Sequence, residues 1–351
     1  MEERGRSVRH GLDNTVDRLD VESAMRHAID LASGAYPHPN PRVGAVILTP
    51  DGHVRSTGFH RSPGGSHAEV AAIAGGVEPG DTLVVTLEPC NHEGRTPPCT
   101  RAILDAGIER VVVGALDPDA RVSGRGVDRL RSAGLDVEVG LLVSEVEAAD
   151  PGYFHHRRTG RARVTLKLAT TLDGQVAAAD GSSRWITSPE ARADVHRLRS
   201  RSDAVLVGMG TVIADDPSLT VRLDDYDGPQ PRAVILAGTR PLPASSIIAG
   251  RDPIVYASSA AVDLNDVVRD LPEHGVLSVL VEGGPRVAAS FLDARLVDEV
   301  VWYVGAKLGG GVGVPAIDGT FASISDAIGL SVTDVTMIGP DVRITGHLEE
   351  E

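Results

Sequence analysis

The 351-residue chain has only two cysteines, Cys90 and Cys99, nine positions apart. One disulfide would add little to a cytosolic protein of this length, so the pair indicates either two buried thiols or a metal site. Aromatic residues make up only 3% of the chain, so its cores must be packed mainly with Val, Leu, Ile and Ala.

Long apolar runs and an excess of positive charge are also missing. No run of about 18 apolar residues occurs, so we predict no membrane span. The net charge of −15 argues against broad contact with nucleic acid or with an anionic membrane. Residues 1–19 are polar and lack the apolar core of a signal peptide, so we expect a disordered tail on a cytoplasmic protein.

What is present suits two globular domains of ordinary size. The chain is 42% hydrophobic and 24% charged, and its 39 glycines and 22 prolines indicate many tight turns. Strand and helix patterns alternate, which predicts α/β domains with largely parallel or mixed sheets. We place the boundary in the polar stretch of residues 144–163, giving domains over residues 20–146 and 160–348.

Apolar periodicity predicts the individual elements. In the first domain we expect helices over residues 21–35, 67–75 and 100–107, and strands over residues 43–49, 83–87 and 111–114. In the second domain we expect strands over residues 164–169, 204–207, 233–236, 254–257, 276–282, 299–304 and 342–346. Helices should begin near Ser188-Pro189, a good N-cap followed by a good first-turn residue, and near Pro285.

A possible metal site joins both cysteines to one histidine. His67 opens a predicted helix, Cys90 follows a predicted strand, and Cys99 precedes another helix. A catalytic zinc ion typically takes three protein ligands and keeps a fourth position open. His67, Cys90 and Cys99 are three ligands of suitable softness for zinc.

Glu69 is the predicted general acid and base beside this metal. Zinc brings the pKa of bound water to about 7, and a nearby carboxylate can carry the released proton to the leaving amine. His-x-Glu followed by Pro-Cys is the signature of zinc-dependent deaminases. Helical spacing alone would point His67 and Glu69 to different faces, so their convergence depends on both lying in the first turn.

Two less specific interpretations stay open at this point. The His-Ala-Glu tripeptide alone is more often a solvated helix start. A structural zinc ion would normally need a fourth Cys or His ligand, and His92 lies near enough in sequence to supply it.

The segment around the cysteines resembles a known family. The run LEPCNHEGRTPPC at residues 87–99 looks like that of the bifunctional riboflavin-biosynthesis deaminase/reductase, whereas ordinary cytidine and tRNA adenosine deaminases carry the two cysteines closer together. HPNPRVG at residues 38–44 and GFH at residues 58–60 also match. The resemblance implies that the deaminase substrate pocket contains Asn40, His60, His92 and Arg95. Loop histidines without a role in binding are the alternative for His60 and His92.

A second site is indicated by a strand that runs into glycines and then a helix. VLVEGGPR at residues 279–286 can bring backbone N–H groups close to a phosphate, although such corners are often only tight turns. The dinucleotide fingerprint Gly-x-Gly-x-x-Gly is absent in the expected context.

The resemblance continues through this second half, where LKLATTLDG at residues 166–174, SRWITS at residues 183–188 and TVIADDPSLTV at residues 211–221 match the family. It implies a dihydrofolate-reductase-like fold after a cytidine-deaminase-like domain, with zinc and NADPH as cofactors. Carried over by position, the NADPH contacts are Ala169, Trp185, Thr211, Asp215, Gly284, Pro285, Arg286, Val287, Ala288, Ala289 and Ser290. The reductase substrate contacts are Ser183, Arg199, Leu219, Arg222 and Glu282.

Some of these assignments also have a purely structural alternative. Arg199 and Arg222 suit a phosphate monoester, because a guanidinium binds it through paired donors, but exposed arginines are common. Trp185 could equally be a core aromatic. The chain departs from the family at Leu236-Ala237-Gly238, where Asp-Ser is usual, and at Asp150 and Tyr153, where Asn and Phe are common.

The sequence therefore predicts two successive steps on one phosphorylated pyrimidine, deamination and then reduction of its ribosyl group by NADPH. Two alternatives are a tRNA or nucleoside deaminase with an appended nucleotide-binding domain, and a structural zinc module joined to a nucleotide sensor. The acidic charge and the long cysteine spacing oppose the first alternative. We expect no nucleic-acid or membrane partner, and a homo-oligomer whose size the sequence does not reveal.

Overall fold

The computed structural model describes residues 18–93, 97–119, 122–259, 261–310, 312–319 and 323–349. These residues divide into two compact units. The first contains the residues up to Ala35 together with Arg42–Ala149, and the second contains Tyr36–Pro41 together with the residues from Asp150 onward. Arg95 and all but the last two residues of the predicted tail lie outside the described ranges.

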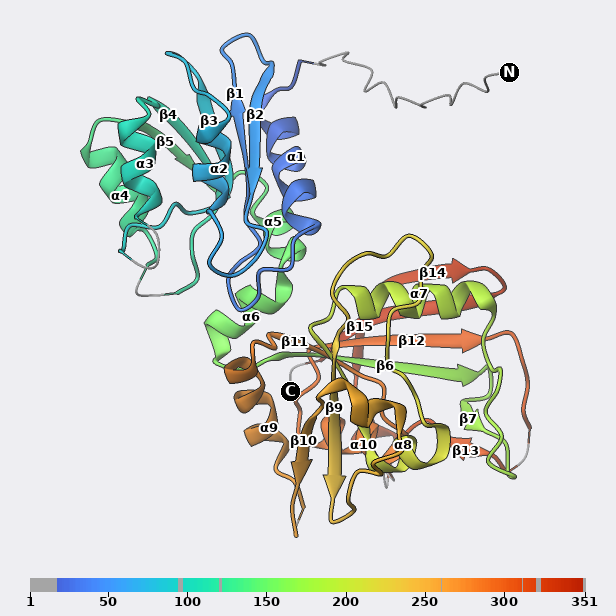
Figure 1. The fold of residues 1–351 in the computed structure, drawn as a ribbon. Helices are drawn as coiled ribbons and strands as arrows, with labels where there is room; N and C mark the ends of the chain where they lie inside the picture. Colours follow the sequence, from blue (N-terminus) through green and yellow to red (C-terminus); the bar gives the residue numbers. More distant parts are fainter. Residues whose placement is uncertain are drawn as a thin grey trace, which may run out of the picture. The chain divides into compact units, whose positions relative to one another are not determined.

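The first unit contains a five-stranded sheet with the order β2-β1-β3-β4-β5 (Figure 1). Strand β1 runs antiparallel to β2 and β3, whereas β3, β4 and β5 are parallel to one another. The strands are β1 (Gly44–Leu48), β2 (Val54–Phe59), β3 (Thr82–Leu87), β4 (Arg110–Ala115) and β5 (Asp136–Val139).

Helices cover both faces of this sheet, and two glycines show why they can approach so closely. A Cβ atom on Gly44 would lie 1.9 Å from the carbonyl oxygen of Ala28 in α1, and one on Gly58 would lie 2.3 Å from that of Ala68 in α2. Gly58 is paired with Ala45, the neighbour of Gly44, so α1 and α2 pack on opposite faces. The helices are α1 (Val21–Ser33), α2 (Ala68–Ala74), α3 (Cys99–Asp105), α4 (Arg125–Ser132) and α5 (Val143–Ala149).

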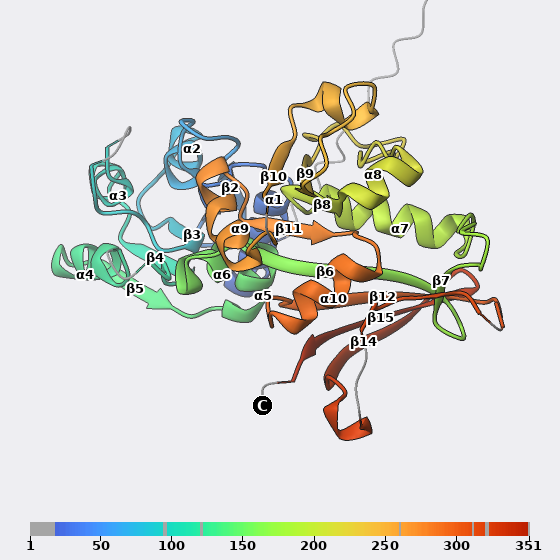
Figure 2. The same ribbon diagram turned by 90° about the horizontal axis from the view of Figure 1, so that it is seen from below.

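The second unit is built on an eight-stranded sheet with the order β10-β9-β8-β11-β6-β12-β15-β14. The first six strands in this order are parallel, and β15 and β14 add an antiparallel edge. Strands β6 and β12 run side by side along most of their length (Figure 2). The strands are β6 (Arg163–Thr171), β8 (Ala204–Gly208), β9 (Arg232–Gly238), β10 (Ile254–Ala257), β11 (Ser278–Val281), β12 (Glu299–Gly305), β14 (Leu330–Ile338) and β15 (Asp341–Leu348).

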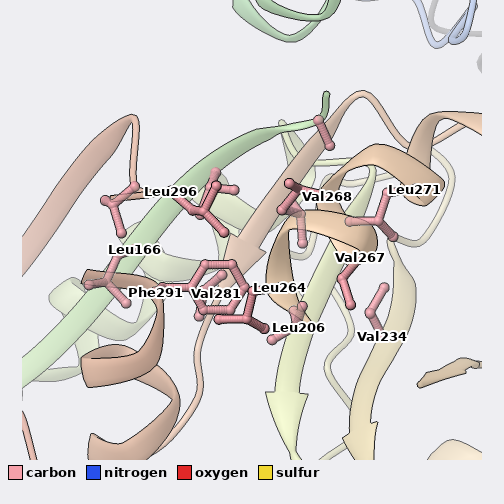
Figure 3. Close-up of a cluster of buried hydrophobic side chains, with 14 of the residues drawn as sticks. Leu166, Leu206, Val234, Leu264, Val267, Val268, Leu271, Val281, Phe291 and Leu296 are labelled. Carbon is pink, nitrogen blue, oxygen red and sulfur yellow. The ribbon is translucent and has the colours of Figure 1, made fainter. Parts of the chain in front are cut away.

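Apolar clusters lie against both faces of this larger sheet. On one face, Phe291 of α10 (Pro285–Asp293) and Leu264 of α9 (Leu264–Asp270) pack over Leu206 and Val281 (Figure 3). On the other face, the side chains of β8 and β9 that point away from the first cluster pack with Met209 and Val212 of α8 (Met209–Asp215) and with Leu198 of α7 (Pro189–Ser200). A small two-stranded sheet pairs β7 (Gln175–Ala177) with β13 (Val314–Pro315).

Most of the polar stretch over residues 144–163 is helical, up to Thr159, which was not predicted from the sequence. Helix α5 is followed by α6 (Pro151–Thr159), whose N-cap Asp150 accepts a hydrogen bond from the backbone N–H of Tyr153 at 3.3 Å. An acidic N-cap before proline is the same kind of signal that Ser188 and Pro189 supply for α7. The chain passes from the first unit into the second between Ala149 and Asp150, while the bounds 20–146 and 160–348 stay a prediction.

None of the helices within the described ranges combines the length and the apolar character that a bilayer-spanning helix requires. The strands predicted in both units are present, each within a few residues of the expected bounds. Strands β2, β5, β7, β13 and β14 were not predicted, because their short or polar sequences lack a continuous apolar run.

Candidate metal centre and cofactor cavity

Three elements of the first unit bring the predicted metal ligands together. His67 is the N-cap residue of α2, Cys90 lies three residues after the end of β3, and Cys99 is the first residue of α3. One ring nitrogen of His67 and the two Sγ atoms all lie within 4.8 Å of one another. His67 Nδ1 is 3.1 Å from Cys99 Sγ and 3.6 Å from Cys90 Sγ.

The electrostatics of this group favour a thiolate at Cys90. Hydrogen bonds from the Cys99 side chain and from His67 outweigh burial and lower the pKa of Cys90 to about 4. The backbone N–H of Cys99 also donates to Cys90 Sγ, at 3.3 Å. The hydrogen bond with Cys90 and burial raise the pKa of Cys99 in turn. An imidazole and two thiols so placed fit zinc, which accepts nitrogen and sulfur ligands.

Glu69 lies in the first turn of α2 and is only 3% exposed. Burial raises its pKa to about 7, and the nearby charge of Cys90 acts in the same direction. His67 and Glu69 converge because His67 is the N-cap, with an extended backbone rather than a helical one. The structure thereby supplies the first-turn geometry that sequence spacing left open.

The four residues predicted for the deaminase substrate pocket differ in their burial and in the part of the chain where they lie. His60 is buried, its Nδ1 lies 3.0 Å from the carbonyl oxygen of Ser66, and its ring meets that of His67 edge-on at 5.4 Å between centroids. His92 is exposed and does not belong to the ligand group that the described residues form. Asn40 belongs to the segment Tyr36–Pro41 of the second unit, and Arg95 lies outside the described residues.

In the second unit, a cavity of about 530 Å³ gathers six of the predicted cofactor contacts. It lies beside the corner where β11 passes through Gly283 and Gly284 into α10, and where β8 passes into α8. Leu236, the first residue of the stretch that departs from the family, lines the cavity together with Arg240, which was not singled out from the sequence. The six predicted lining residues are Thr211, Asp215, Gly284, Pro285, Arg286 and Val287.

The other predicted cofactor contacts of α10 do not line this cavity. The side chains of Ala288 and Ala289 are turned into the core, at 0% and 6% exposure, so only their backbone atoms could contact a cofactor. Ser290 donates its hydroxyl to the carbonyl oxygen of Arg286 at 2.9 Å. Arg286 is highly exposed and pairs with Asp318 at 3.2 Å. The predicted contacts from this helix that line the cavity therefore lie at its start.

A second cavity of the same unit, about 350 Å³, contains Ser183 and Trp185 in its lining. Trp185 is 59% exposed, so it is not a core aromatic. The guanidinium carbons of Arg192 and Arg184 lie 4.3 Å and 5.8 Å from its ring centroid. Eight of the predicted cofactor and substrate contacts thus line two cavities of one unit, while Ala169 lies on β6.

A charged cluster joins two of the predicted substrate residues. Arg199 of α7 makes two hydrogen bonds to Glu282, which follows β11, and Lys167 of β6 lies 3.7 Å from the same carboxylate. Arg222 lies on the loop after α8, and its guanidinium donates to Ser218 Oγ at 2.6 Å. Lys167 was not predicted from the sequence, although a lysine in a buried strand is unusual enough to indicate a special role. Leu219 is buried, with a positive φ of 52°.

The comparisons with known proteins agree with this division of the chain. Residues 19–115 match the cytidine and deoxycytidylate deaminase zinc-binding region. Residues 162–344 match the RibD C-terminal domain. The first match contains all three candidate metal ligands, and the second contains both cavities and the charged cluster.

Relatives and solved structures match nearly the whole chain. The riboflavin biosynthesis protein RibD of Mycobacterium tuberculosis strain H37Rv is 40% identical over 327 residues, covering 92% of this chain and 94% of the relative. RibD of Acinetobacter baumannii has a TM-score of 0.87 at 34% identity, covering 94% of this chain and 99% of that one.

A diaminohydroxyphosphoribosylaminopyrimidine deaminase/5-amino-6-(5-phosphoribosylamino)uracil reductase from Thermotoga maritima is similar as well. It has a TM-score of 0.85 at 36% identity, covering 93% of this chain and 98% of that one. The matched zinc-binding region implies Zn²⁺ as a cofactor and the matched reductase domain implies NADPH. The chain belongs to the RibD family and is a bifunctional riboflavin-biosynthesis enzyme, with a deaminase domain of cytidine-deaminase-like fold and a reductase domain of dihydrofolate-reductase-like fold.

Proposed function

We propose that the first unit deaminates 2,5-diamino-6-(5-phosphoribosylamino)pyrimidin-4-one and that the second reduces the ribosyl group of the product with NADPH. In the first step water adds at the amino-bearing ring carbon and ammonia leaves. In the second step hydride transfer converts the ribosylamino group to ribitylamino, giving 5-amino-6-(5-phosphoribitylamino)uracil. The observation that carries the first step is a group of three metal ligands with a buried carboxylate beside it.

His67, Cys90 and Cys99 would hold zinc, which when bound supplies Lewis-acid activation of water near neutral pH. Glu69 would accept the proton of that water and return it to the departing amine. Its burial suits this role, because a carboxyl group whose pKa is about 7 exchanges protons readily at neutral pH. His60, buried against His67, would face the substrate ring.

The reductase site would position its two ligands without a covalent residue of its own. NADPH supplies the hydride, and the first turn of α10 with Thr211 and Asp215 would hold it in the larger cavity. Arg199 and Arg222 would bind the substrate phosphate, and Glu282 would orient Arg199.

The choice of substrate is supported by the names of the relatives and by charge. The Thermotoga maritima protein is named for both successive reactions. A tRNA substrate would require a broad basic surface, which a chain of net charge −15 is poorly suited to provide. A purely structural zinc ion would require a fourth ligand, and the described residues contribute only His67, Cys90 and Cys99 to the candidate group.

Glu69→Gln tests the proposed deamination. Ammonia release should fall at least about a hundredfold, because the amide cannot carry the proton, while zinc content and NADPH oxidation on the deaminated substrate stay unchanged. Glu109→Gln, the same change at an exposed glutamate of this unit, should leave all three at the wild-type level. Undiminished ammonia release from Glu69→Gln would exclude this mechanism.

We also propose that the enzyme is a cytoplasmic homo-oligomer without a nucleic-acid partner. Strand β14 forms one edge of the large sheet and exposes Val332, Val335 and Met337, at 53%, 63% and 63%. An exposed apolar edge strand favours pairing with a second copy. Light scattering on the purified chain would give a multiple of the 36.7 kDa monomer mass. Val335→Lys should shift that mass toward the monomer.

A further inference from the structure

The turn that carries Cys90 is held by a buried carboxylate that the deamination mechanism does not use. Glu88 directly follows β3, two residues before Cys90, and is 4% exposed. Its carboxylate accepts four backbone hydrogen bonds from the start of α4 and the loop before it. Oε1 accepts from Gly126 at 2.7 Å and Val127 at 3.2 Å, and Oε2 accepts from Gly124 at 2.9 Å and Asp117 at 3.3 Å.

These four bonds use the acceptor capacity of the carboxylate, which has about four lone-pair sites. Glu88 therefore has no free oxygen for a metal ion. Its geometry is that of a fixed attachment point between the turn and α4.

The backbone of the turn packs directly on α4 at the same place. A Cβ atom on Gly126 would lie 2.0 Å from the carbonyl oxygen of Pro89 and 3.1 Å from Glu88 Oε1. Only glycine therefore allows α4 to come this close to the residue before Cys90. The hydrogen bonds of Glu88 and the absence of a side chain at Gly126 together hold the turn against α4.

The other side of the turn is attached to α3 by Asn91, the residue after Cys90. Asn91 Oδ1 accepts from Thr100 Oγ1 at 2.9 Å, and its Nδ2 donates to the carbonyl oxygen of Arg125 at 3.5 Å. The backbone N–H of Thr100 donates to the carbonyl oxygen of Cys90 at 3.2 Å. Cys99, the third candidate ligand, is the neighbour of Thr100 in α3.

We propose that Glu88 and Asn91 are positioning residues for the metal centre. Together they clamp the turn Glu88–Asn91 between the starts of α4 and α3, and so fix the separation of the Cys90 and Cys99 sulfurs. Groups that orient metal ligands without touching the metal typically change metal affinity by about 10–100-fold when they are replaced. This inference rests on the proposed role of Cys90 as a ligand.

Zinc release from the full chain to an excess of a chromogenic chelator tests the clamp. Glu88→Gln turns an amide donor toward backbone N–H donors, so at least one bond is lost and zinc should leave about 10–100 times faster. Asn91→Ala should accelerate release by a smaller factor. Glu109→Gln, with the same charge change on the surface, should release zinc at the wild-type rate.

Cobalt substitution separates positioning from a merely structural role. The d–d and thiolate-to-cobalt absorption bands of Glu88→Gln should move in wavelength, because they report ligand geometry, which a loss of stability alone does not alter. Wild-type bands and a wild-type release rate in folded Glu88→Gln overturn the proposal.

If Glu88→Gln does not fold, as judged by circular dichroism, Asn91→Ala decides. The side chain of Asn91 is exposed. If the Asn91→Ala variant releases zinc within twofold of the wild-type rate and its cobalt bands are unshifted, the proposed clamp is wrong. A failure of the proposed function would be seen differently: if Cys90 is not a zinc ligand, the Cys90→Ser variant would release zinc at the wild-type rate.

Discussion

Arg199 and Glu282 form a bidentate ion pair, with Nε 2.6 Å from Oε1 and Nη2 3.0 Å from Oε2. Their side chains are 12% and 8% exposed. Burial acts to raise the pKa of Glu282, but the charges of Lys167 and Arg199 outweigh it and lower the pKa to about 2. The carboxylate is therefore ionised at any working pH and takes the Nε and Nη2 donors of Arg199, whose Nη1 donates to the carbonyl oxygen of Thr220 at 3.0 Å.

Arg199→Lys should weaken phosphate binding in the reductase. Lysine keeps the charge but cannot hold the Glu282 carboxylate through paired donors, so its cation is no longer fixed in place, and a hydrogen bond to a charged group contributes about 1.5–3 kcal/mol. We expect the KM of the phosphorylated substrate to rise roughly ten- to a hundredfold, with little change in the KM of NADPH. Steady-state NADPH oxidation measures both constants. Arg201→Lys, at an exposed arginine after the same helix, should match wild type, and an unchanged substrate KM in Arg199→Lys would remove Arg199 from the phosphate site.

His38 should make the stability of the second unit depend on pH. It lies between two carboxylates, with Nδ1 2.7 Å from Asp203 and Nε2 2.8 Å from Asp150. Burial opposes its protonation, but the charges of Asp203 and Asp150 and their hydrogen bonds raise its pKa from 6.5 to about 10. A raised pKa adds stability that is full below pH 6.5 and is lost as the pH rises toward 10.

Urea unfolding of His38→Gln against wild type tests this dependence. Breaking a buried ion pair costs about 3–5 kcal/mol, so the variant should be less stable by that order below pH 6.5, with the difference shrinking up to pH 10. His274→Gln is the matched control, because His274 pairs with Asp270 at 3.1 Å on the surface and should change stability little. A His38→Gln difference that stays constant across this pH range would contradict a charged His38.

Gly284→Ala should weaken NADPH binding without weakening the fold. A Cβ atom there finds its nearest neighbour, Thr211 Oγ1, at 3.9 Å and would project toward the cavity. We expect the KM of NADPH to rise at least about tenfold, or about 1.4 kcal/mol, with an unchanged unfolding temperature.

Gly283→Ala is the contrasting variant in the same corner. Its Cβ would lie 2.5 Å from Val287 Cβ and Cγ1, so overpacking should cost about 1–3 kcal/mol of stability. Equal NADPH affinity of Gly284→Ala and wild type would place the cofactor elsewhere.

Removal of the metal should silence one activity only. A chelator, or the substitution Cys90→Ser, should abolish ammonia release and zinc binding while NADPH oxidation on the deaminated substrate continues. Loss of a ligand that binds only the folded state also lowers stability, so the unfolding temperature of the first unit should fall. Metal analysis and calorimetry measure both effects. Deamination that survives complete zinc removal would refute the role of these three ligands.

Much of the fold could be predicted from the sequence, because buried parallel strands are continuous apolar runs. The strand over residues 43–49 and the helix at Ser188-Pro189 appear close to their expected bounds. Edge strand β14 and helix α6 could not be predicted from apolar periodicity, because neither has a continuous buried face. The polar residues of β14 are exposed to solvent. Those of α6 are paired with neighbouring side chains.

The spacing of His67, Cys90 and Cys99 and the Gly283-Gly284 corner follow from the sequence by itself, because such sites need particular residue types at particular separations along the chain. Only the tertiary structure decided that Glu69 is buried beside His67, that Lys167 joins the Arg199–Glu282 pair, and that Glu88 collects four N–H groups from the start of α4 and the loop before it. These relationships join residues far apart in the chain or depend on burial. The energy of a charge depends on its neighbours in space, which the order of residues does not specify.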